Sequence, residues 1–250
     1  MPTMLITGAA KRIGRTIALE IATKGWQVAV HHHDSLAESE QLVKTISAAG
    51  GKAFAVQCDL SNRAQSAQLI DQCIALADEP VVALINNASV FESDDAMTAD
   101  NDSWDKHLEV NLHAPFLLSQ ALAKSLDGIV AGNIINIIDQ RVLKLNPQYL
   151  SYTLSKSGLW TLTRTLAQSL APTIRVNAIG PGPTLASIHQ NDDDFQRETT
   201  SVLLGRGPDP KEIASTIAYI LDTPSLTGQI IALDGGQHLA WQTPDIDLTD

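Results

Sequence analysis

Cysteine, aromatic residues and positive charge are scarce in this chain of 250 residues. Only Cys58 and Cys73 occur, without a CxxC spacing, which argues against a disulfide framework or a cysteine metal site and predicts two buried reduced thiols. Lys and Arg number 17 against 28 Asp and Glu, giving a formal net charge of -11. Such acidity disfavours binding to nucleic acid or to an anionic membrane, so we expect neither as a partner.

Long hydrophobic runs are also missing. The chain has no run of about eighteen apolar residues, and it starts without a basic segment and cleavage site. We therefore expect neither a membrane span nor a secretory signal, and predict a cytoplasmic protein. Hydrophobic residues nevertheless make up 44% of the chain, which is enough to build one large core.

Short apolar runs alternate with helical patterns along the whole chain. Runs rich in β-branched residues predict buried strands at 4–7, 27–31, 53–57, 81–85, 133–138, 174–178 and 229–233. Helical patterns lie between them at 12–23, 36–49, 63–77, 104–126, 152–170 and 210–221. This alternation predicts an α/β fold: a single-domain, Rossmann-type, doubly wound parallel sheet of about seven strands with helices on both faces, over residues 1–250.

Two segments stand outside this alternation. Residues 180–207 begin with Gly180-Pro181-Gly182-Pro183 and contain three consecutive aspartates with little strand periodicity. We predict a substrate loop there, consisting of a mobile loop and a short helix that cover the site. Residues 237–250 form a C-terminal extension for which a lid, a subunit contact and a disordered tail are all open interpretations.

The turn after the first strand is a candidate dinucleotide site. Gly8 and Gly14 bracket a turn that runs directly into a helix, and small residues there let a pyrophosphate approach the helix N-terminus. A tight strand-to-helix turn needs glycine in any case, but the position after the first strand favours the cofactor interpretation. Arg12 and Arg15 add positive charge to this turn.

The second strand ends in three histidines, His31, His32 and His33, followed by Asp34 and Ser35. No acid occupies the strand tip to bind ribose hydroxyls, so this end has room for a 2′-phosphate and we expect NADPH rather than NADH. Asp34 would repel that phosphate unless it points away, and a solvated strand end is the alternative. Metal binding is not expected, because only His31 and His33 share a face and no third ligand accompanies them.

Tyr152 and Lys156 are the candidate catalytic pair. Positions i and i+4 share one face of a helix, so the phenol and the ammonium can point into one cleft. A nearby cation would lower the tyrosine pKa from about 10, which favours proton transfer. Alone this pattern is also typical of a half-buried tyrosine beside a solvated lysine.

The chain resembles the short-chain dehydrogenase/reductase family over nearly its whole length. The family's glycine turn matches residues 7–14 including Ile13, and its helix asparagine and catalytic pair match Asn111, Tyr152 and Lys156. The resemblance implies further cofactor contacts at Asp59, Leu60, Asn87, Ala88, Ser89, Pro181 and Gly182, and a C-terminal signature at 233–236. It also implies a homotetramer that pairs through the helices at 104–126 and 152–170.

Within that family the chain is most similar to the pteridine reductases and the related dihydromonapterin and dihydrofolate reductases. The shared features are the Thr-Gly-Ala-Ala-Lys-Arg-Ile-Gly-Arg string, the His-rich strand end, the Asn-Ala-Ser-Val-Phe segment, and Asp139 in place of a serine. This resemblance implies that Phe91 stacks on a pterin, that Arg12 contacts cofactor phosphate and pterin, and that Ser89 lies against both ligands. Asp34, where these enzymes often have Arg, and Val90 depart from the pattern.

Asp139 suits a pterin better than a ketone. Hydride transfer to a ketone builds negative charge that an ionised carboxylate would repel, whereas the nitrogen of a C=N bond must gain a proton. We therefore predict that Asp139 supplies a proton to a dihydropterin nitrogen, that Tyr152 positions the substrate and that Lys156 binds the nicotinamide ribose. Asn111 would hold a water that connects Lys156 to solvent. The alternative is a structural Asp139 paired with Arg141 or Lys144.

Three other functions remain open. An NADPH-dependent carbonyl or 3-oxoacyl thioester reductase would use the same tyrosine and lysine with Asp139 protonated or bypassed. A non-catalytic dinucleotide-sensing protein would need the fold but not the proton-transfer residues. A purely structural subunit would use only the oligomer surfaces.

Overall fold

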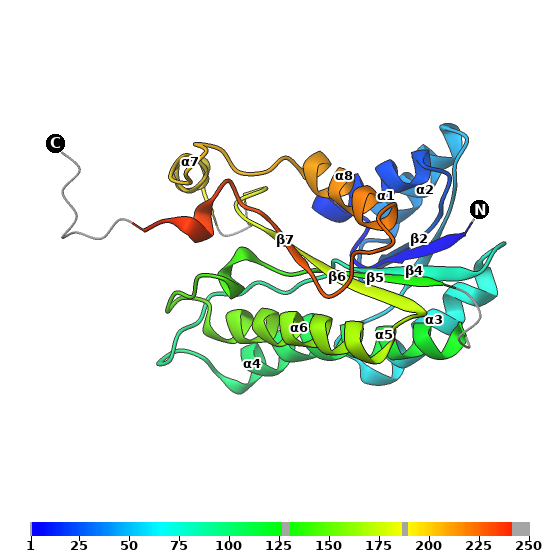
Figure 1. The fold of residues 1–250 in the computed structure, drawn as a ribbon, viewed down its shortest axis with the longest axis horizontal. Coiled ribbons are helices and arrows are strands. Elements are labelled where there is room, and N and C mark those ends of the chain that lie inside the picture. Colours follow the sequence, from blue (N-terminus) through cyan, green and yellow to red (C-terminus); the bar gives the residue numbers. More distant parts are fainter. Residues whose placement is uncertain (1, 127–130, 187–189, 242–250) are drawn as a thin grey trace.

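The protein folds around one seven-stranded parallel sheet. The structure is a computed structural model, and it describes residues 2–126, 131–186 and 190–241. The strands are β1 (Thr3–Ile6), β2 (Gln27–His32), β3 (Lys52–Gln57), β4 (Val81–Asn86), β5 (Gly132–Ile137), β6 (Ile174–Pro181) and β7 (Ile230–Leu233). Their order is β3-β2-β1-β4-β5-β6-β7 (Figure 1). The strand order reverses between β1 and β4, and ligands bind beside such a reversal in open α/β sheets.

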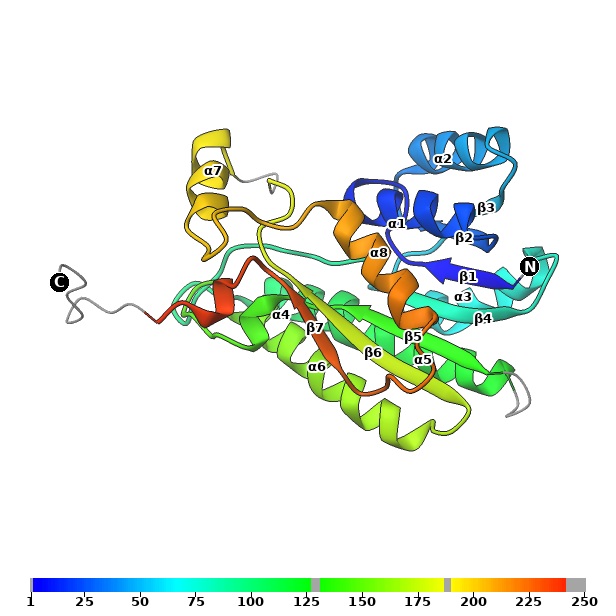
Figure 2. The same cartoon turned by 45° about the horizontal axis from the view of Figure 1, so that its top comes forward.

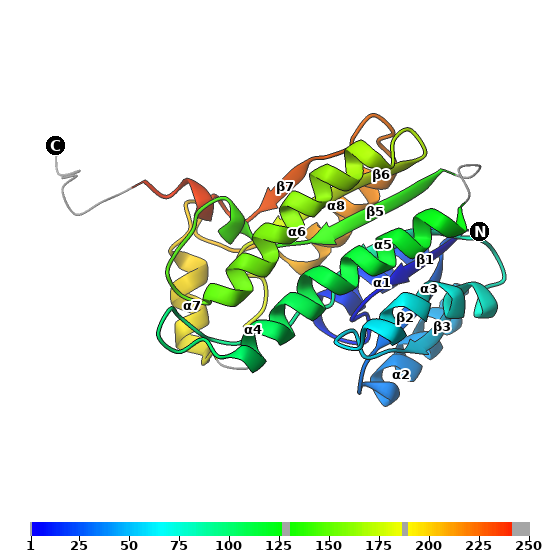
Figure 3. The same cartoon turned by 90° about the horizontal axis from the view of Figure 1, so that it is seen from below.

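Helices cover both faces of the sheet. They are α1 (Arg12–Thr23), α2 (Leu36–Ala48), α3 (Arg63–Leu76), α4 (Asn101–Leu108), α5 (Ala114–Ser125), α6 (Leu150–Ser169), α7 (Asp192–Thr200) and α8 (Pro210–Leu221), with short turns η1 (Glu109–His113), η2 (Gln140–Val142) and η3 (Gln237–Leu239). Figures 1 and 3 show α1, α2 and α8 on one face and α3, α4, α5 and α6 on the other. The predicted doubly wound α/β fold is confirmed.

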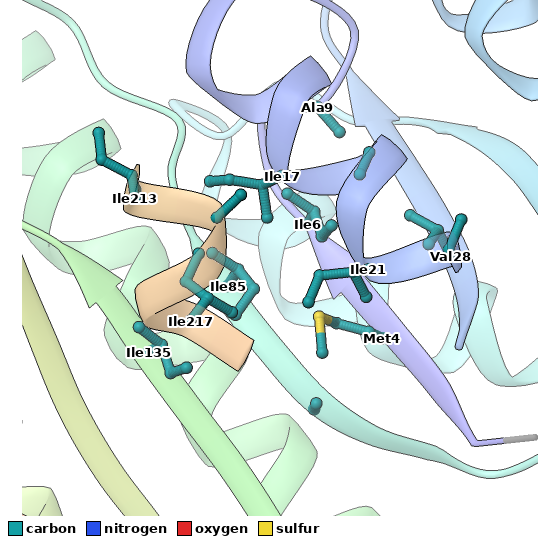
Figure 4. Packing of buried hydrophobic residues seen from close by; sticks show 14 of the residues in the cluster. Met4, Ile6, Ala9, Ile17, Ile21, Val28, Ile85, Ile135, Ile213 and Ile217 are labelled. Carbon is teal, nitrogen blue, oxygen red and sulfur yellow. The ribbon is translucent and has the colours of Figure 1, made fainter. Parts of the chain in front are cut away.

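The central strands are mainly apolar, because helices bury both faces of the sheet. On one face, Ile6 and Met4 of β1 pack with Ile17 and Ile21 of α1 and with Ile217 of α8 (Figure 4). The intervening residue Leu5 points into the second core, under α3 and α5. This alternation locks the register of the sheet, because a shift by one residue would exchange the two cores.

The helix predicted at 104–126 is interrupted in the structure. Glu109–His113 form one turn of π-helix between α4 and α5. Pro115 lies at the start of α5 and has no backbone N–H to donate to the residue one turn before it, which accounts for the local change of pitch. The turn matters for function because it carries Asn111.

The segment 180–207 contains the predicted short helix, α7, which Figure 2 shows beyond the carboxyl ends of the strands. Its predicted mobility remains a prediction, and residues 187–189 of the loop lie outside the described residues. Most of the C-terminal extension, 242–250, also lies outside them. Within the described ranges, no helix is both long and apolar enough to cross a bilayer.

Candidate active site

A cleft of about 600 Å³ opens at the carboxyl ends of the strands. It brings together residues from the turn after β1, the segments after β4, β5 and β6, and helices α6 and α7. Thirteen of the predicted site residues line it: Gly8, Arg12, Ile13, Gly14, Asn87, Ala88, Ser89, Phe91, Asp139, Tyr152, Lys156, Pro181 and Gly182. The cleft is therefore the one place where most of the predicted residues meet.

The glycine turn is closely joined to the segment after β4. Gly8 adopts φ +62°, and a Cβ on Gly14 would lie 2.3 Å from the Gly8 carbonyl oxygen. Asn87 donates from Nδ2 to the carbonyl oxygens of Thr7 and Gly8, while Thr7 Oγ1 accepts from the backbone N–H groups of Asn87 and Ala88. Thr7 was not among the predicted residues, although it ends the first strand where a hydroxyl can bridge to a neighbouring strand.

His31 turns inward and holds this turn in place. Its Nδ1 accepts a hydrogen bond from Gly8 N at 3.0 Å, so Nε2 carries the proton and donates to the Cys58 carbonyl oxygen at 3.0 Å. Burial lowers the pKa of His31 to about 4, which keeps the ring neutral. Because both ring nitrogens are engaged by backbone, the structure assigns His31 a supporting position behind the cofactor turn rather than a contact with the cofactor.

The other residues after β2 face different ways. His32 is buried, with Nδ1 3.2 Å from the His33 carbonyl oxygen. His33 is exposed between Asp34 and Asp59, and the Asp34 side chain is 85% exposed. Asp34 thus points to solvent, which is the orientation that a bound 2′-phosphate requires. Ser35 precedes α2 without capping it through its side chain.

Asp59 and Leu60 lie just beyond the cleft, after β3. Asp59 Oδ1 accepts from the backbone N–H and the hydroxyl of Ser61, and these bonds lower the pKa of Asp59. Leu60 is buried in the second core. The contact of both residues with an adenine stays a prediction.

Asp139 and Tyr152 form the polar centre of the cleft. Tyr152 donates from Oη to Asp139 Oδ2 at 2.9 Å, and Asp139 Oδ1 accepts from Arg141 N at 2.8 Å. Burial raises the pKa of Asp139. The hydrogen bonds from Arg141 N and Tyr152 and the positive charges of Arg141 and Lys156 act in the opposite direction. Burial, followed by the Asp139 charge, raises the pKa of Tyr152 well above 10. The expected lowering of the tyrosine pKa is wrong for this chain, because burial disfavours the phenolate and the neighbouring Asp139 charge disfavours it further.

Lys156 is held below the tyrosine. Its side chain is buried, Nζ donates to the Ile137 carbonyl oxygen at 2.9 Å, and Nζ lies 5.7 Å from the centroid of the Tyr152 ring. Burial lowers the pKa of Lys156 to about 8. One ammonium hydrogen is fixed by the strand, so the others remain available to a ligand in the cleft.

Aromatic rings form one side of the cleft. Phe91 stacks on Tyr149 with 4.3 Å between ring centroids, and its ring meets Tyr152 edge-on at 4.7 Å. The Arg141 guanidinium lies over Tyr149 at 4.8 Å and 4.0 Å from Asp139 Oδ1. Tyr149 and Arg141 were missed as cleft residues, because neither belongs to a periodic pattern: Tyr149 precedes α6 in the left-handed region, with φ 57°.

Asn111 supports the cleft from behind. Its Oδ1 accepts from Ser89 Oγ and Val90 N, and its Nδ2 donates to the Val90 carbonyl oxygen and to Ser155 Oγ. These partners fill its side chain and do not include Lys156. The π-helical turn therefore fixes the segment that leads to Phe91.

The outer wall comes from the segment 180–207 and the C-terminal extension. Arg12 donates from Nη2 to the Leu185 carbonyl oxygen at 3.2 Å, which joins the glycine turn to the segment before α7. Phe195 and Glu198 of α7 and Gln237 of η3 also line the cleft. Sequence reasoning predicted the covering segment but not these side chains, because α7 is short and polar and has no buried residue that would mark its inner face. No cluster of three or more metal-ligating side chains occurs in the part of the chain that the structure describes.

Comparison with known proteins identifies the family. The short chain dehydrogenase profile matches residues 2–197. The 3-oxoacyl-[acyl-carrier-protein] reductase FabG of Staphylococcus epidermidis is 30% identical over 240 residues, covering 94% of this chain and 98% of the relative. The chain belongs to the short-chain dehydrogenase/reductase family, as the sequence predicted.

Solved structures give a narrower similarity. The FolM alternative dihydrofolate reductase 1 of Brucella suis, crystallised with NADP, is 48% identical, with a TM-score of 0.94 and 98% of each chain covered. A blue fluorescent protein from a metagenomic library, crystallised with NADPH, is 29% identical, with a TM-score of 0.87, covering 94% of this chain and 97% of that one. The chain is thus more similar to the FolM protein than to the FabG relative, as the resemblance to dihydrofolate reductases predicted.

Proposed function

We propose that this protein reduces a dihydropterin to its tetrahydro form with hydride from NADPH. The observation that carries the proposal is the hydrogen bond between Tyr152 and Asp139, whose oxygens lie 2.9 Å apart in the cleft. A carboxyl group beside the substrate can supply a proton to a ring nitrogen, whereas its ionised form would repel the charge that develops on a ketone oxygen. The identity of 48% with a FolM protein supports the same substrate class.

The described residues fit a dinucleotide. A Cβ on Gly14 would strike the Gly8 carbonyl oxygen, so glycine lets the turn pack tightly against the start of α1, where a pyrophosphate binds in this kind of fold. Gly182 is equally confined, since a Cβ there would lie 2.8 Å from Asp234 Cα. Gly8, Ile13, Asn87, Ala88, Ser89, Pro181 and Gly182 would line the cofactor, Arg12 and Ser35 its phosphates, and Lys156 its ribose. When bound, NADPH supplies the hydride.

The chain's own residues handle the proton. Burial raises the pKa of Asp139, so its acid form persists to higher pH than for an exposed aspartate. Protonated Asp139 can donate to N5 of a 7,8-dihydropterin, while its Oδ1 stays oriented by Arg141 N. Tyr152 holds the substrate edge and Phe91 the ring face, which limits the orientations of the substrate. Asn111 keeps Ser89 and Phe91 in place.

The second candidate is an NADPH-dependent carbonyl or 3-oxoacyl thioester reductase. It is favoured by the retained Tyr152 and Lys156 and by the 30% identity to FabG proteins. We rank it second, because an acid, Asp139, stands where this chemistry uses a serine hydroxyl, and because the identity to the FolM protein, 48%, exceeds the 30% identity to FabG.

A substrate panel separates the two functions. The purified protein with NADPH is offered 7,8-dihydromonapterin, 7,8-dihydrobiopterin, 7,8-dihydrofolate and a set of ketones that includes acetoacetyl thioesters, and the loss of NADPH absorbance is followed. We expect turnover of at least one dihydropterin, with kcat/KM above that of every ketone. Turnover of ketones alone would replace the proposal with its alternative.

We further propose a cytoplasmic homotetramer. Trp104 on α4 and Leu154 on α6 expose 37% and 44% of their surface on the face that family members use for pairing. Light scattering coupled to gel filtration should give four times the mass of 26.8 kDa. A monomer at micromolar concentration would contradict this part of the proposal.

A further inference from the structure

A buried chain of hydrogen bonds joins three side chains that the proposed reaction does not use. Ser151 Oγ lies 2.7 Å from His107 Nδ1 and donates to Asp94 Oδ2. His107 and Ser151 are 0% exposed and Asp94 is 5% exposed, and none of them lines the cleft. Such a network excludes water and holds its members in one arrangement.

The direction of each bond follows from the backbone. The N–H of Glu92 donates to His107 Nε2 at 3.1 Å, so this nitrogen is the unprotonated one. Burial lowers the pKa of His107, which keeps the ring neutral and puts its proton on Nδ1. His107 therefore donates to Ser151 Oγ, whose own hydrogen goes to Asp94. A serine that accepts a hydrogen bond from histidine is not being activated as a nucleophile, so this trio is not a hydrolytic site.

Asp94 also caps the helix that carries the catalytic pair. Its carbonyl oxygen accepts from the N–H groups of Tyr149 and Leu150, and its Oδ1 accepts from Ser151 N at 3.1 Å. Tyr149 lies in the left-handed region and makes no side-chain cap. The start of α6 is therefore capped by a residue fifty-seven positions earlier in the chain.

The two ends of this network reach the two sides of the cleft. At one end, Glu92 follows Phe91 directly. At the other, Ser151 precedes Tyr152, and Tyr149 stacks on Phe91. The contacts thus form a closed ring from the segment after β4, through α4, to the start of α6 and back through the two aromatic rings.

We propose that Asp94, His107 and Ser151 are positioning residues, which fix Phe91 and Tyr152 relative to each other and so set the efficiency of substrate reduction. This inference rests on the proposed function for its assay. We expect that a change in the network of Asp94, His107 and Ser151 lowers kcat/KM for the dihydropterin but leaves the NADPH affinity intact. The glycine turn and Lys156, which would bind the cofactor, are not members of this network.

Ser151→Ala tests the proposal, with Thr153→Val as its matched control. Thr153 follows Tyr152 in the sequence, as Ser151 precedes it. Thr153 is also buried, and its Oγ1 has no hydrogen-bond partner among the described residues. We expect Ser151→Ala to lower kcat/KM by about tenfold or more, because small displacements of reacting groups cost large factors in rate. Thr153→Val should stay within about twofold of the unaltered protein, and the NADPH Kd should change less than about twofold in both.

Stability is recorded separately so that a structural effect is not mistaken for a positioning effect. Rates are measured at least about 15 °C below the melting temperature of each variant, where all are folded. Asp94→Asn keeps one acceptor oxygen and should retain more activity than Asp94→Ala. Ser151→Ala with unchanged kcat/KM, or with a loss equal to that of Thr153→Val, would overturn the inference. Absence of dihydropterin turnover in the unaltered protein would instead overturn the proposed function, and the inference would then be assayed on whichever ketone is turned over.

Discussion

Tyr152 Oη and Asp139 Oδ2 lie 2.9 Å apart, in a hydrogen bond between a buried phenol and a carboxyl group whose side chain is 20% exposed. Burial disfavours the charged form of both groups, so the phenol stays protonated and the pKa of the carboxyl group is raised. Asp139 and Tyr152 are therefore candidate proton donors beside the proposed substrate nitrogen. The role of each can be tested by a separate substitution.

Asp139→Asn should abolish most dihydropterin turnover. Asparagine keeps the shape and an acceptor for Arg141 N but carries no transferable acid proton, so kcat should fall by about a hundredfold or more. NADPH binding, measured by fluorescence titration, should stay within about twofold. If the variant keeps substantial turnover, Asp139 has no part in the proton supply.

Phe91→Ala should act mainly on substrate binding. Loss of the ring removes the stacking surface and also the partner of Tyr149, so kcat/KM for the dihydropterin should fall by about tenfold, chiefly through KM. Phe91→Tyr keeps the ring face and serves as the conservative control. A kcat effect of equal size with unchanged KM would show that Phe91 does not hold the substrate.

The charge on Lys156 should make folding stability depend on alkaline pH. Its pKa is about 8 in the folded chain against 10.5 as the ordinary value, so between these limits the unfolded chain binds the extra proton. Stability from this group therefore rises with pH, by about 2 kcal/mol between pH 7 and pH 9.5. Urea unfolding of the unaltered protein and of Lys156→Met at both pH values should show this rise only in the former, and parallel changes would contradict it.

His31 should make the protein sensitive to mild acid. Its pKa of about 4 lies below the ordinary 6.5, so the unfolded chain takes up the proton first as the pH falls. Stability should drop by about 2 kcal/mol between pH 6.5 and pH 5 from this group alone. His31→Asn should be less stable at pH 7 but show a flatter slope over this range. Equal slopes for the two proteins would remove His31 as the source.

The parts of the fold that follow local rules could be predicted from the sequence. Strands buried on both faces are continuous apolar runs, so all seven were predicted to within a few residues, and the glycines of the first turn marked the cleft. The interruption at 109–113 was not predicted, because its cause, Pro115, also suits the first turn of an ordinary helix.

What could not be predicted depends on contacts between distant residues. Strand alternation places His31 and His33 on the same face but does not say which of them turns in to bind Gly8. Asp94 lies in a loop with no periodic pattern, and its bond to Ser151 joins residues fifty-seven positions apart. The direction of the tyrosine pKa was wrong for the same reason, since burial depends on the whole assembled cleft.

The sheet order has a consequence for shortened forms of the protein. β1 lies at the centre and pairs with β4, while the cleft also needs Gly182, which is bonded to β7, and Gln237 beyond it. The cleft is therefore complete only when segments from Gly8 to Gln237 have been brought together. A chain cut before Leu233 should lack a finished site and should not oxidise NADPH, because Gly182 would lose its hydrogen-bond partner and the cleft its wall at Gln237.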